Sequence, residues 1–175
     1  SPGFATEKAG VVLAAQELPV FSDIELAARR IQGEAVLTPL LENVKLNELT
    51  GGRVFIKAEC LQRTGSFKFR GAWNCISKLD PAQNKGGVVA FSSGNHAQGV
   101  AAAAQLRGIP ALIVMPEDTP EIKKANTKSY GAEVVTYDRA TESREEIANH
   151  YVAKRGAVLV PPFEHADIIA GQGTS

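Results

Sequence analysis

The segment VVAFSSGNHAQGVAAAAQLRGIPALIVM, residues 88–115, carries the pattern that decides the fold. Its apolar run Val88 to Phe91 predicts a buried strand, and the alanine-rich stretch from about Asn95 to Arg107 predicts a helix that Gly108 closes. A second apolar run, Ala111 to Met115, predicts the next strand. Because apolar strands joined by helices are typical of parallel sheets buried on both faces, the segment predicts an α/β fold.

The same alternation extends to both sides of this segment. Further helices are expected from about Ser66 to Leu79, after Pro120 and from Glu142 to Lys154, with strands at Ala132 to Tyr137 and Ala157 to Val160. We therefore predict an α/β fold whose open parallel sheet is covered by helices on both faces. Earlier in the chain we expect a helix from Ser22 to Gly33, a short helix from Asn43 to Leu49 and a strand from Val54 to Ala58.

The composition is that of a globular protein of 175 residues, 44% hydrophobic and 22% charged. Nineteen basic residues balance nineteen acidic ones, so the basic excess that binds nucleic acid or an anionic membrane is missing. The apolar run Gly10 to Ala15 is too short to span a bilayer and lacks the basic start of a signal peptide. We expect a cytoplasmic protein with neither a nucleic-acid nor a membrane partner.

The cysteines and histidines show no metal-binding spacing. Cys60 and Cys75 form no CxxC pair, and the three histidines are scattered along the sequence. We predict two packed free thiols and no metal site, although the sequence alone leaves a disulfide between them open. HExxH, P-loop and GxGxxG motifs are absent, which argues against zinc proteases, P-loop NTPases and the usual dinucleotide fingerprint.

The first candidate for chemistry is Lys68, which lies between Phe67 and Phe69 at the start of a predicted helix. Apolar surroundings disfavour the charged ammonium and lower the pKa of a lysine. A neutral lysine amine is what Schiff-base chemistry with a carbonyl requires. The alternative is an exposed helical lysine whose stem lies across the neighbouring rings.

The second candidate is the loop Ser92-Ser93-Gly94-Asn95-His96, between a predicted strand and a predicted helix. Free main-chain N–H groups at a helix start, together with hydroxyl, amide and imidazole donors, predict a carboxylate or phosphate pocket. Open α/β sheets bind their ligands at this edge. The alternative is an ordinary Ser or Asn helix cap.

These motifs, taken together and in order, resemble the fold-type II pyridoxal-phosphate (PLP) enzymes, in their threonine/serine dehydratase and serine racemase branch. The resemblance runs from about Ile24 to Thr174 and corresponds to the N-terminal half of that family. Its motifs are S-F-K-x-R-G-A from Ser66, S-S-G-N-H-A-Q-G from Ser92, M-P at Met115, P-x-x-K from Pro120, G-A-E-V from Gly131 and A-G-Q-G-T from Ala170.

The resemblance implies roles for individual residues. Lys68 would hold PLP covalently and act as the base at the substrate Cα, with Phe67 beside the cofactor ring and Asn95 bonded to its 3′ oxygen. Ser93 would also occupy the place of the second acid/base of a racemase. The substrate carboxylate would be bound by Ser92, Ser93, Asn95 and His96.

The resemblance also implies a domain division. Residues 1–20 would be a poorly ordered lead-in, residues 21–60 the N-terminal part of a large domain, residues 61–161 a small α/β domain, and residues 162–175 a return to the large domain. The family's phosphate-binding loop and any cation site lie downstream of the Gly-Gln-Gly-Thr segment. We therefore expect a piece of a longer enzyme, which by itself would bind PLP weakly and self-associate as a homo-oligomer.

The function implied first is a PLP-dependent lyase, an L-threonine or L-serine dehydratase that converts a small amino acid into a 2-oxo acid and ammonia. Serine racemase and 3-hydroxyaspartate dehydratase are alternatives. Arg144, in the run Glu142-Ser143-Arg144-Glu145, favours these alternatives through the resemblance. The racemase-like branch is similar in carrying Ser-Arg-Glu there, which implies an arginine that can reach a bound diacid, although Arg144 can equally be a solvated helix charge. An alternative of another class is a non-catalytic, isolated domain.

Overall fold

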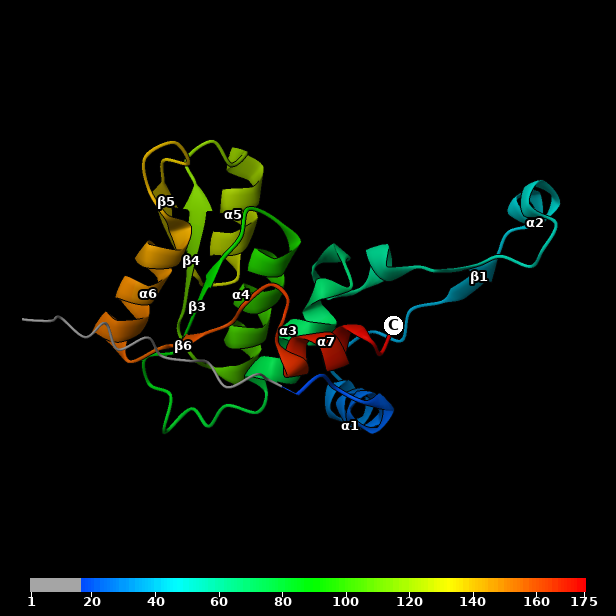
Figure 1. Ribbon diagram of the computed structural model, residues 1–175, viewed down its shortest axis with the longest axis horizontal. Coiled ribbons are helices and arrows are strands. Elements are labelled where there is room, and N and C mark those ends of the chain that lie inside the picture. The colour runs from blue at the N-terminus through cyan, green and yellow to red at the C-terminus, as the bar shows by residue number, and fades with distance from the viewer. Residues whose placement is uncertain (1–16) are drawn as a thin grey trace, which may run out of the picture.

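A computed structural model describes residues 17–175, and Figure 1 shows them as a helix-covered sheet from which an arm projects. The sheet has four parallel strands in the order β5-β4-β3-β6. The strands are β3 (Val88–Phe91), β4 (Ala111–Pro116), β5 (Glu133–Tyr137) and β6 (Val158–Leu159). This sheet, and with it the predicted α/β class, is confirmed.

Helices cover both faces of the sheet, as predicted. The helix α6 (Arg144–Arg155) packs on one face, and α4 (Asn95–Arg107) with α5 (Glu121–Ser129) packs on the other (Figure 1). Side chains alternate between the two layers: Ile113 belongs to the larger buried cluster on the α4 side, and its neighbour Leu112 to the smaller cluster beneath α6. All six residues of β4 are buried, which explains why its sequence is continuously apolar.

A second helical layer lies beside α4. It consists of α1 (Phe21–Ile31), α3 (Lys68–Ile76) and α7 (Ala166–Gln172), and α3 contacts each of the others. The helices α3 and α7 approach closely because both carry glycine at the contact: a Cβ at Gly171 would lie only 2.5 Å from the Cα of Gly71. This layer holds α7, at the end of the chain, against the start of the predicted small domain.

The arm comprises residues 40–57. It is built from β1 (Leu40–Glu42), α2 (Val44–Thr50) and β2 (Phe55–Lys57), with β1 and β2 paired antiparallel. Two short 3-10 turns, η1 (Glu59–Leu61) and η2 (Arg63–Gly65), lead from the arm back to α3. The short helix and the strand at β2 were predicted, but β1 was not.

The prediction for the two cysteines needs a correction, and the prediction for the lead-in falls mostly on residues outside the described part of the chain. Cys75 is a packed free thiol as predicted, whereas Cys60 is free but exposed, because it lies in η1, which has no buried residue. Of the lead-in predicted over residues 1–20, residues 1–16 lie outside the described part of the chain. The domain boundaries stay predictions. Among the described residues, no helix has the length and apolar character needed to cross a membrane.

Candidate functional site

The site lies at the carboxyl edge of the sheet, where β3 ends and α4 begins. The Ser92 N–H donates to the Val114 carbonyl at 3.1 Å, so the loop leaves the sheet only after Ser92. The Ser92 hydroxyl then accepts a hydrogen bond from the Gly94 N–H at 3.2 Å. A Cβ at Gly94 would have no atom within 4 Å, so the space beside the loop is open. The fold thus presents a turn of polar residues to an open edge.

The first turn of α4 supplies donors at this edge. No side chain caps the helix, whose N-cap is Gly94. Within the described residues, the main-chain N–H groups of Asn95 and His96 have no protein acceptor. Together with the positive end of the helix dipole, these groups favour an anion such as a carboxylate. Asn95 is exposed and Ser92 and Ser93 are half-buried, so their side chains are accessible beside the same groups.

Lys68 is the first residue of α3, and it packs against α4. A Cβ at Gly99 would lie 3.3 Å from the Lys68 carbonyl, so glycine at this position lets the two helices approach. The Lys68 side chain is half-buried, and its Nζ lies 3.3 Å from the Pro162 carbonyl and 5.5 Å from the centre of the Phe67 ring. Its one hydrogen-bond acceptor within the described chain is a neutral carbonyl, so no carboxylate fixes the amine. Phe67 itself is 43% exposed.

His96 is placed differently from the other loop residues. Its ring is buried, and Nε2 lies 3.0 Å from the Val160 carbonyl. Burial lowers the pKa of His96 to about 4; the bond to Val160 opposes this and the Lys68 charge adds to it. The imidazole is therefore neutral and directed into the protein, away from the exposed side chain of Asn95. Of the four predicted carboxylate ligands, His96 is the one that offers only its main-chain N–H at the open edge.

Arg144 begins α6 and lies beside the loop. The centre of its guanidinium is 4.9 Å from the centre of the Phe91 ring, and Phe91 directly precedes Ser92. Its Nε donates to the exposed carboxylate of Glu145 at 3.0 Å. Exposed pairs of this kind contribute little free energy, so Arg144 can exchange Glu145 for another carboxylate. The fold therefore brings a cation, the loop and Lys68 to the same region of the sheet edge.

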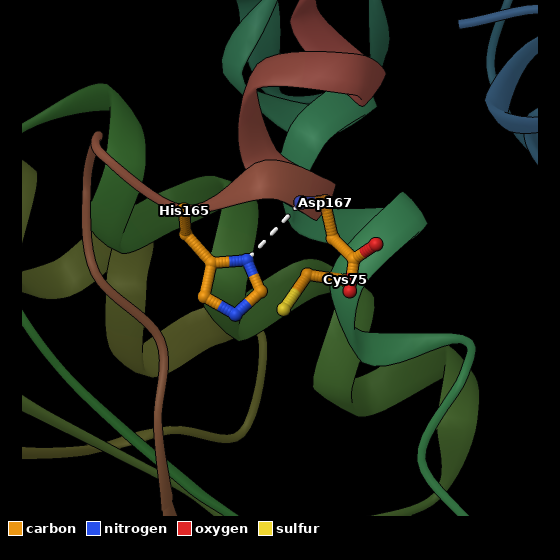
Figure 2. Close-up of side chains that lie close together, drawn as sticks. All are labelled: Cys75, His165 and Asp167. Carbon is orange, nitrogen blue, oxygen red and sulfur yellow. Dashed lines mark hydrogen bonds between the residues drawn. The ribbon is translucent and has the colours of Figure 1, made fainter. Parts of the chain in front are cut away.

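A separate cluster was missed by the sequence reading, which predicted no metal site. Cys75, His165 and Asp167 place their ligand atoms within 4.8 Å of one another (Figure 2). Spacing gave no signal because Cys75 and His165 are far apart in the sequence and meet only through the packing of α3 on α7.

Comparison with known proteins gives a family and several relatives. A family model described as "Pyridoxal-phosphate dependent enzyme" matches residues 31–175. The chain is 54% identical over 159 residues to L-threo-3-hydroxyaspartate ammonia-lyase of Pseudomonas sp, an alignment that covers 91% of this chain and 50% of the relative. It is 47% identical over 152 residues to L-threonine ammonia-lyase of Thermotoga maritima, covering 87% of this chain and 38% of the relative.

A solved structure agrees with the sequence matches. Serine racemase from Dictyostelium discoideum superposes with a TM-score of 0.84 at 40% identity, over 89% of this chain and 51% of that one. The chain spans about half the length of the curated relatives it matches, or less.

Proposed function

Because the chain belongs to the pyridoxal-phosphate dependent enzyme family, we propose that it forms part of an ammonia-lyase for a β-hydroxy amino acid, with L-threo-3-hydroxyaspartate as the substrate. The products would be a 2-oxo acid and ammonia. The relatives named as ammonia-lyases agree with the predicted class, a PLP-dependent lyase. The choice of a diacid over threonine or serine, which the sequence favoured first, is our own and is supported by Arg144.

The residues at the sheet edge fit the cofactor. Lys68 offers a half-buried amine without a carboxylate partner, Phe67 an accessible ring face, and Asn95 an exposed amide. We propose that Lys68 Nζ holds PLP covalently, that Phe67 packs near its ring and that Asn95 donates to its 3′ oxygen. When bound, PLP supplies an electron sink that makes the substrate Cα proton acidic.

The chain's own residues would orient the substrate and move its proton. The N–H groups at the start of α4 and the side chains of Ser92, Ser93 and Asn95 would bind the α-carboxylate, which fixes the orientation of the Cα–H bond. We propose that Lys68 Nζ accepts the Cα proton. The bond from His96 to Val160 would hold the first turn of α4 against the residue that follows β6 and so keep the loop in place.

The observation that carries the choice of substrate is the position of Arg144 over Phe91, beside the loop. A second carboxylate on the substrate would give the guanidinium a bidentate partner in place of the exposed Glu145. Threonine and serine have no such group, so for them Arg144 would have no role. The relative with 54% identity is named for the same diacid.

A comparison of rates with three substrates tests this proposal. Initial rates with L-threo-3-hydroxyaspartate, L-serine and L-threonine are compared in the full-length protein and in its Arg144→Ala variant. Losing a charge-assisted hydrogen bond costs about 1.5–3 kcal/mol, so kcat/KM for the diacid should fall roughly 10- to 150-fold while the serine rate stays the same. The matched control is Arg139→Ala, because Arg139 is exposed and pairs with Asp118. Equal losses for all three substrates, or none, would exclude Arg144 as the diacid ligand.

Racemisation of serine is the second candidate. It is supported by Ser93, whose half-buried hydroxyl has no hydrogen-bond partner within the described chain. A hydroxyl opposite Lys68 could return a proton to the other face of Cα. A Ser93→Ala variant should then lose formation of D-serine while retaining elimination. A non-catalytic domain would turn over none of these substrates.

A further inference from the structure

The cluster of Cys75, His165 and Asp167 lies outside the proposed active site and has no role in the proposed function. Cys75 comes from the last turns of α3, and His165 and Asp167 come from the start of α7. Figure 2 shows the thiol, the imidazole and the carboxylate gathered at the contact between these helices. Each offers one ligand atom, and these atoms lie within 4.8 Å of one another.

The backbone that carries these side chains is held in place by other contacts. Asn74 Nδ2 donates to the Asp167 carbonyl at 2.7 Å, one residue away from Cys75. The Gly71–Gly171 approach fixes the spacing of the two helices one turn further along. These contacts, made by other atoms of α3 and α7, position the backbone that carries the three ligands, as a preorganised site requires.

The donor set selects a class of metal. Sulfur, imidazole nitrogen and carboxylate oxygen are the three ligands of zinc, which they bind at about 2.0 to 2.3 Å. In a tetrahedron of that size the donors lie roughly 3.3 to 3.8 Å apart, so small side-chain rotations would close the site. Mg²⁺ and Ca²⁺ prefer all-oxygen ligands, so the thiol disfavours them. We propose that Cys75, His165 and Asp167 bind a zinc-class divalent cation that joins α7 to α3.

Binding would replace interactions that the three residues already make. Asp167 would leave Lys78, whose Nζ lies 2.9 Å from its Oδ1, and the His165 ring would give up the hydrogen bond that its Nδ1 accepts from the Asp167 N–H at 3.1 Å. The thiol would release its proton to solvent as the sulfur–metal bond forms. Burial, followed by the charge of Asp167, raises the pKa of Cys75 to about 12, which adds to the cost of losing that proton. We therefore expect a reversible site rather than a permanently filled one.

One of the three ligands, Asp167, lines a cavity through which a cation would approach. A cavity of about 310 Å³ lies between α1, α3 and α7, and both Lys78 and Asp167 line it. The Asp167 side chain is 29% exposed, whereas Cys75 is 7% exposed. A cation would meet the carboxylate first and the thiol last, and the fourth ligand would be a water from this cavity.

The two cysteines provide a matched test. Cd²⁺ is titrated into the cofactor-free protein, and the ultraviolet thiolate-to-cadmium charge-transfer band is recorded for the wild type, Cys75→Ser and Cys60→Ser. Cys60 is exposed and outside the cluster, so its variant should keep the band, with saturation at one equivalent. The Cys75→Ser variant should lose it. No band in the wild type, or a band lost in Cys60→Ser instead, would overturn the site.

A second variant is needed because serine in place of the buried Cys75 can destabilise α3. Asp167→Asn keeps the side-chain shape and should weaken Zn²⁺ binding at least tenfold in calorimetry, with an unchanged circular dichroism spectrum. A tenfold excess of Mg²⁺ should not compete for the wild-type site. Unchanged Zn²⁺ affinity in Asp167→Asn, or displacement by Mg²⁺, would contradict the assigned ligands. None of these measurements depends on catalysis, so they separate this proposal from the proposed function.

Discussion

The sheet body and the arm both contain runs of apolar residues, but they bury these residues to very different extents. The six residues of β4 are all buried, whereas the three residues of β1 are all exposed and no residue of α2 is buried. Six of the arm's large apolar side chains are at least 44% exposed: Leu40, Leu41, Val44, Leu49, Phe55 and Ile56. The arm projects away from the helix-covered sheet (Figure 1), so these side chains have no helical layer to cover them and form an exposed apolar surface. This exposed surface is the basis on which we still expect self-association.

The difference shows where the site obtains its rigidity. The root of the arm consists of Thr38 and Glu59, which flank it in the sequence, and a buried network joins this root to α3. Arg70 donates to Glu59 at 2.6 and 2.8 Å, and the Thr38 hydroxyl donates to Glu59 at 2.5 Å. Arg70 lies two residues after Lys68, so this network also fixes the start of α3. We expect changes in the body and at the root to have large effects, and equivalent changes in the arm to have small ones.

The largest expected difference is between two lysines. Lys68→Ala should lower turnover by about 10³-fold or more, because it removes both the covalent attachment for PLP and the base at Cα. Lys45→Ala, on the exposed surface of α2, should leave turnover unchanged. Steady-state kinetics of both variants, with circular dichroism to confirm folding, make the comparison. Near-normal turnover in Lys68→Ala would remove Lys68 from the site.

The next comparison is between two ion pairs. Glu59→Gln leaves the Arg70 guanidinium, with a side chain only 6% exposed, without its counter-charge, and should lower the free energy of unfolding by about 3–5 kcal/mol. In the arm, Glu42 and Arg53 form a solvent-exposed pair, so Glu42→Gln should not move the unfolding midpoint. Urea denaturation measures both. Similar shifts for the two variants would contradict the contrast between root and arm.

His96, in the body, should make stability depend on pH as its imidazole titrates, whereas the arm contains no histidine. The pKa of His96 falls from 6.5 in the unfolded chain to about 4 in the fold, mainly through burial. The unfolded state therefore binds the proton first as the pH falls. Stability that is complete above pH 6.5 should decline by about 3 kcal/mol by pH 4. His96→Gln should remove this decline, whereas the exposed control His150→Gln should retain it. An unchanged slope in His96→Gln would contradict the buried neutral ring.

Two asparagines give the smallest expected effects. Asn95→Ala should weaken PLP binding by about 1.5–3 kcal/mol, the cost of one hydrogen bond to a charged group. Asn43, whose side chain accepts a hydrogen bond from the Leu46 N–H, caps α2 in the arm. Asn43→Ala should fray α2 and leave PLP affinity unchanged. Equilibrium titration with PLP distinguishes them, and equal affinities in the two variants would place Asn95 outside the ring contact.

Much of the body could be predicted from sequence because burial on both faces leaves a strong pattern. The apolar runs at β3 and β4 and the glycine after α4 gave the strands, the helix and the α/β class directly. The strand β1 was missed because three exposed residues show no alternation and depend on pairing with β2 for their conformation. Short strands whose partners decide their structure leave no such pattern.

Some features of the site could likewise be predicted from the sequence, and others could not. The loop and Lys68 were recognisable because their chemistry depends on consecutive residues, and their individual roles remain predictions. The inward direction of the His96 ring was not predictable, because it depends on the position of the Val160 carbonyl. The meeting of Cys75 with His165 depends on the packing of α3 against α7, which local sequence does not encode.

The most direct test of the sheet-edge site is to locate PLP on the protein. PLP is added below one equivalent, the mixture is reduced with borohydride, and the modified lysine is identified by peptide mass spectrometry. Because Lys68 offers its half-buried amine beside the loop at the start of α4, we predict that the pyridoxyl group is found on Lys68 and that Lys68→Ala yields no replacement site. Modification spread over exposed lysines such as Lys45, with Lys68 unmodified, would contradict the account.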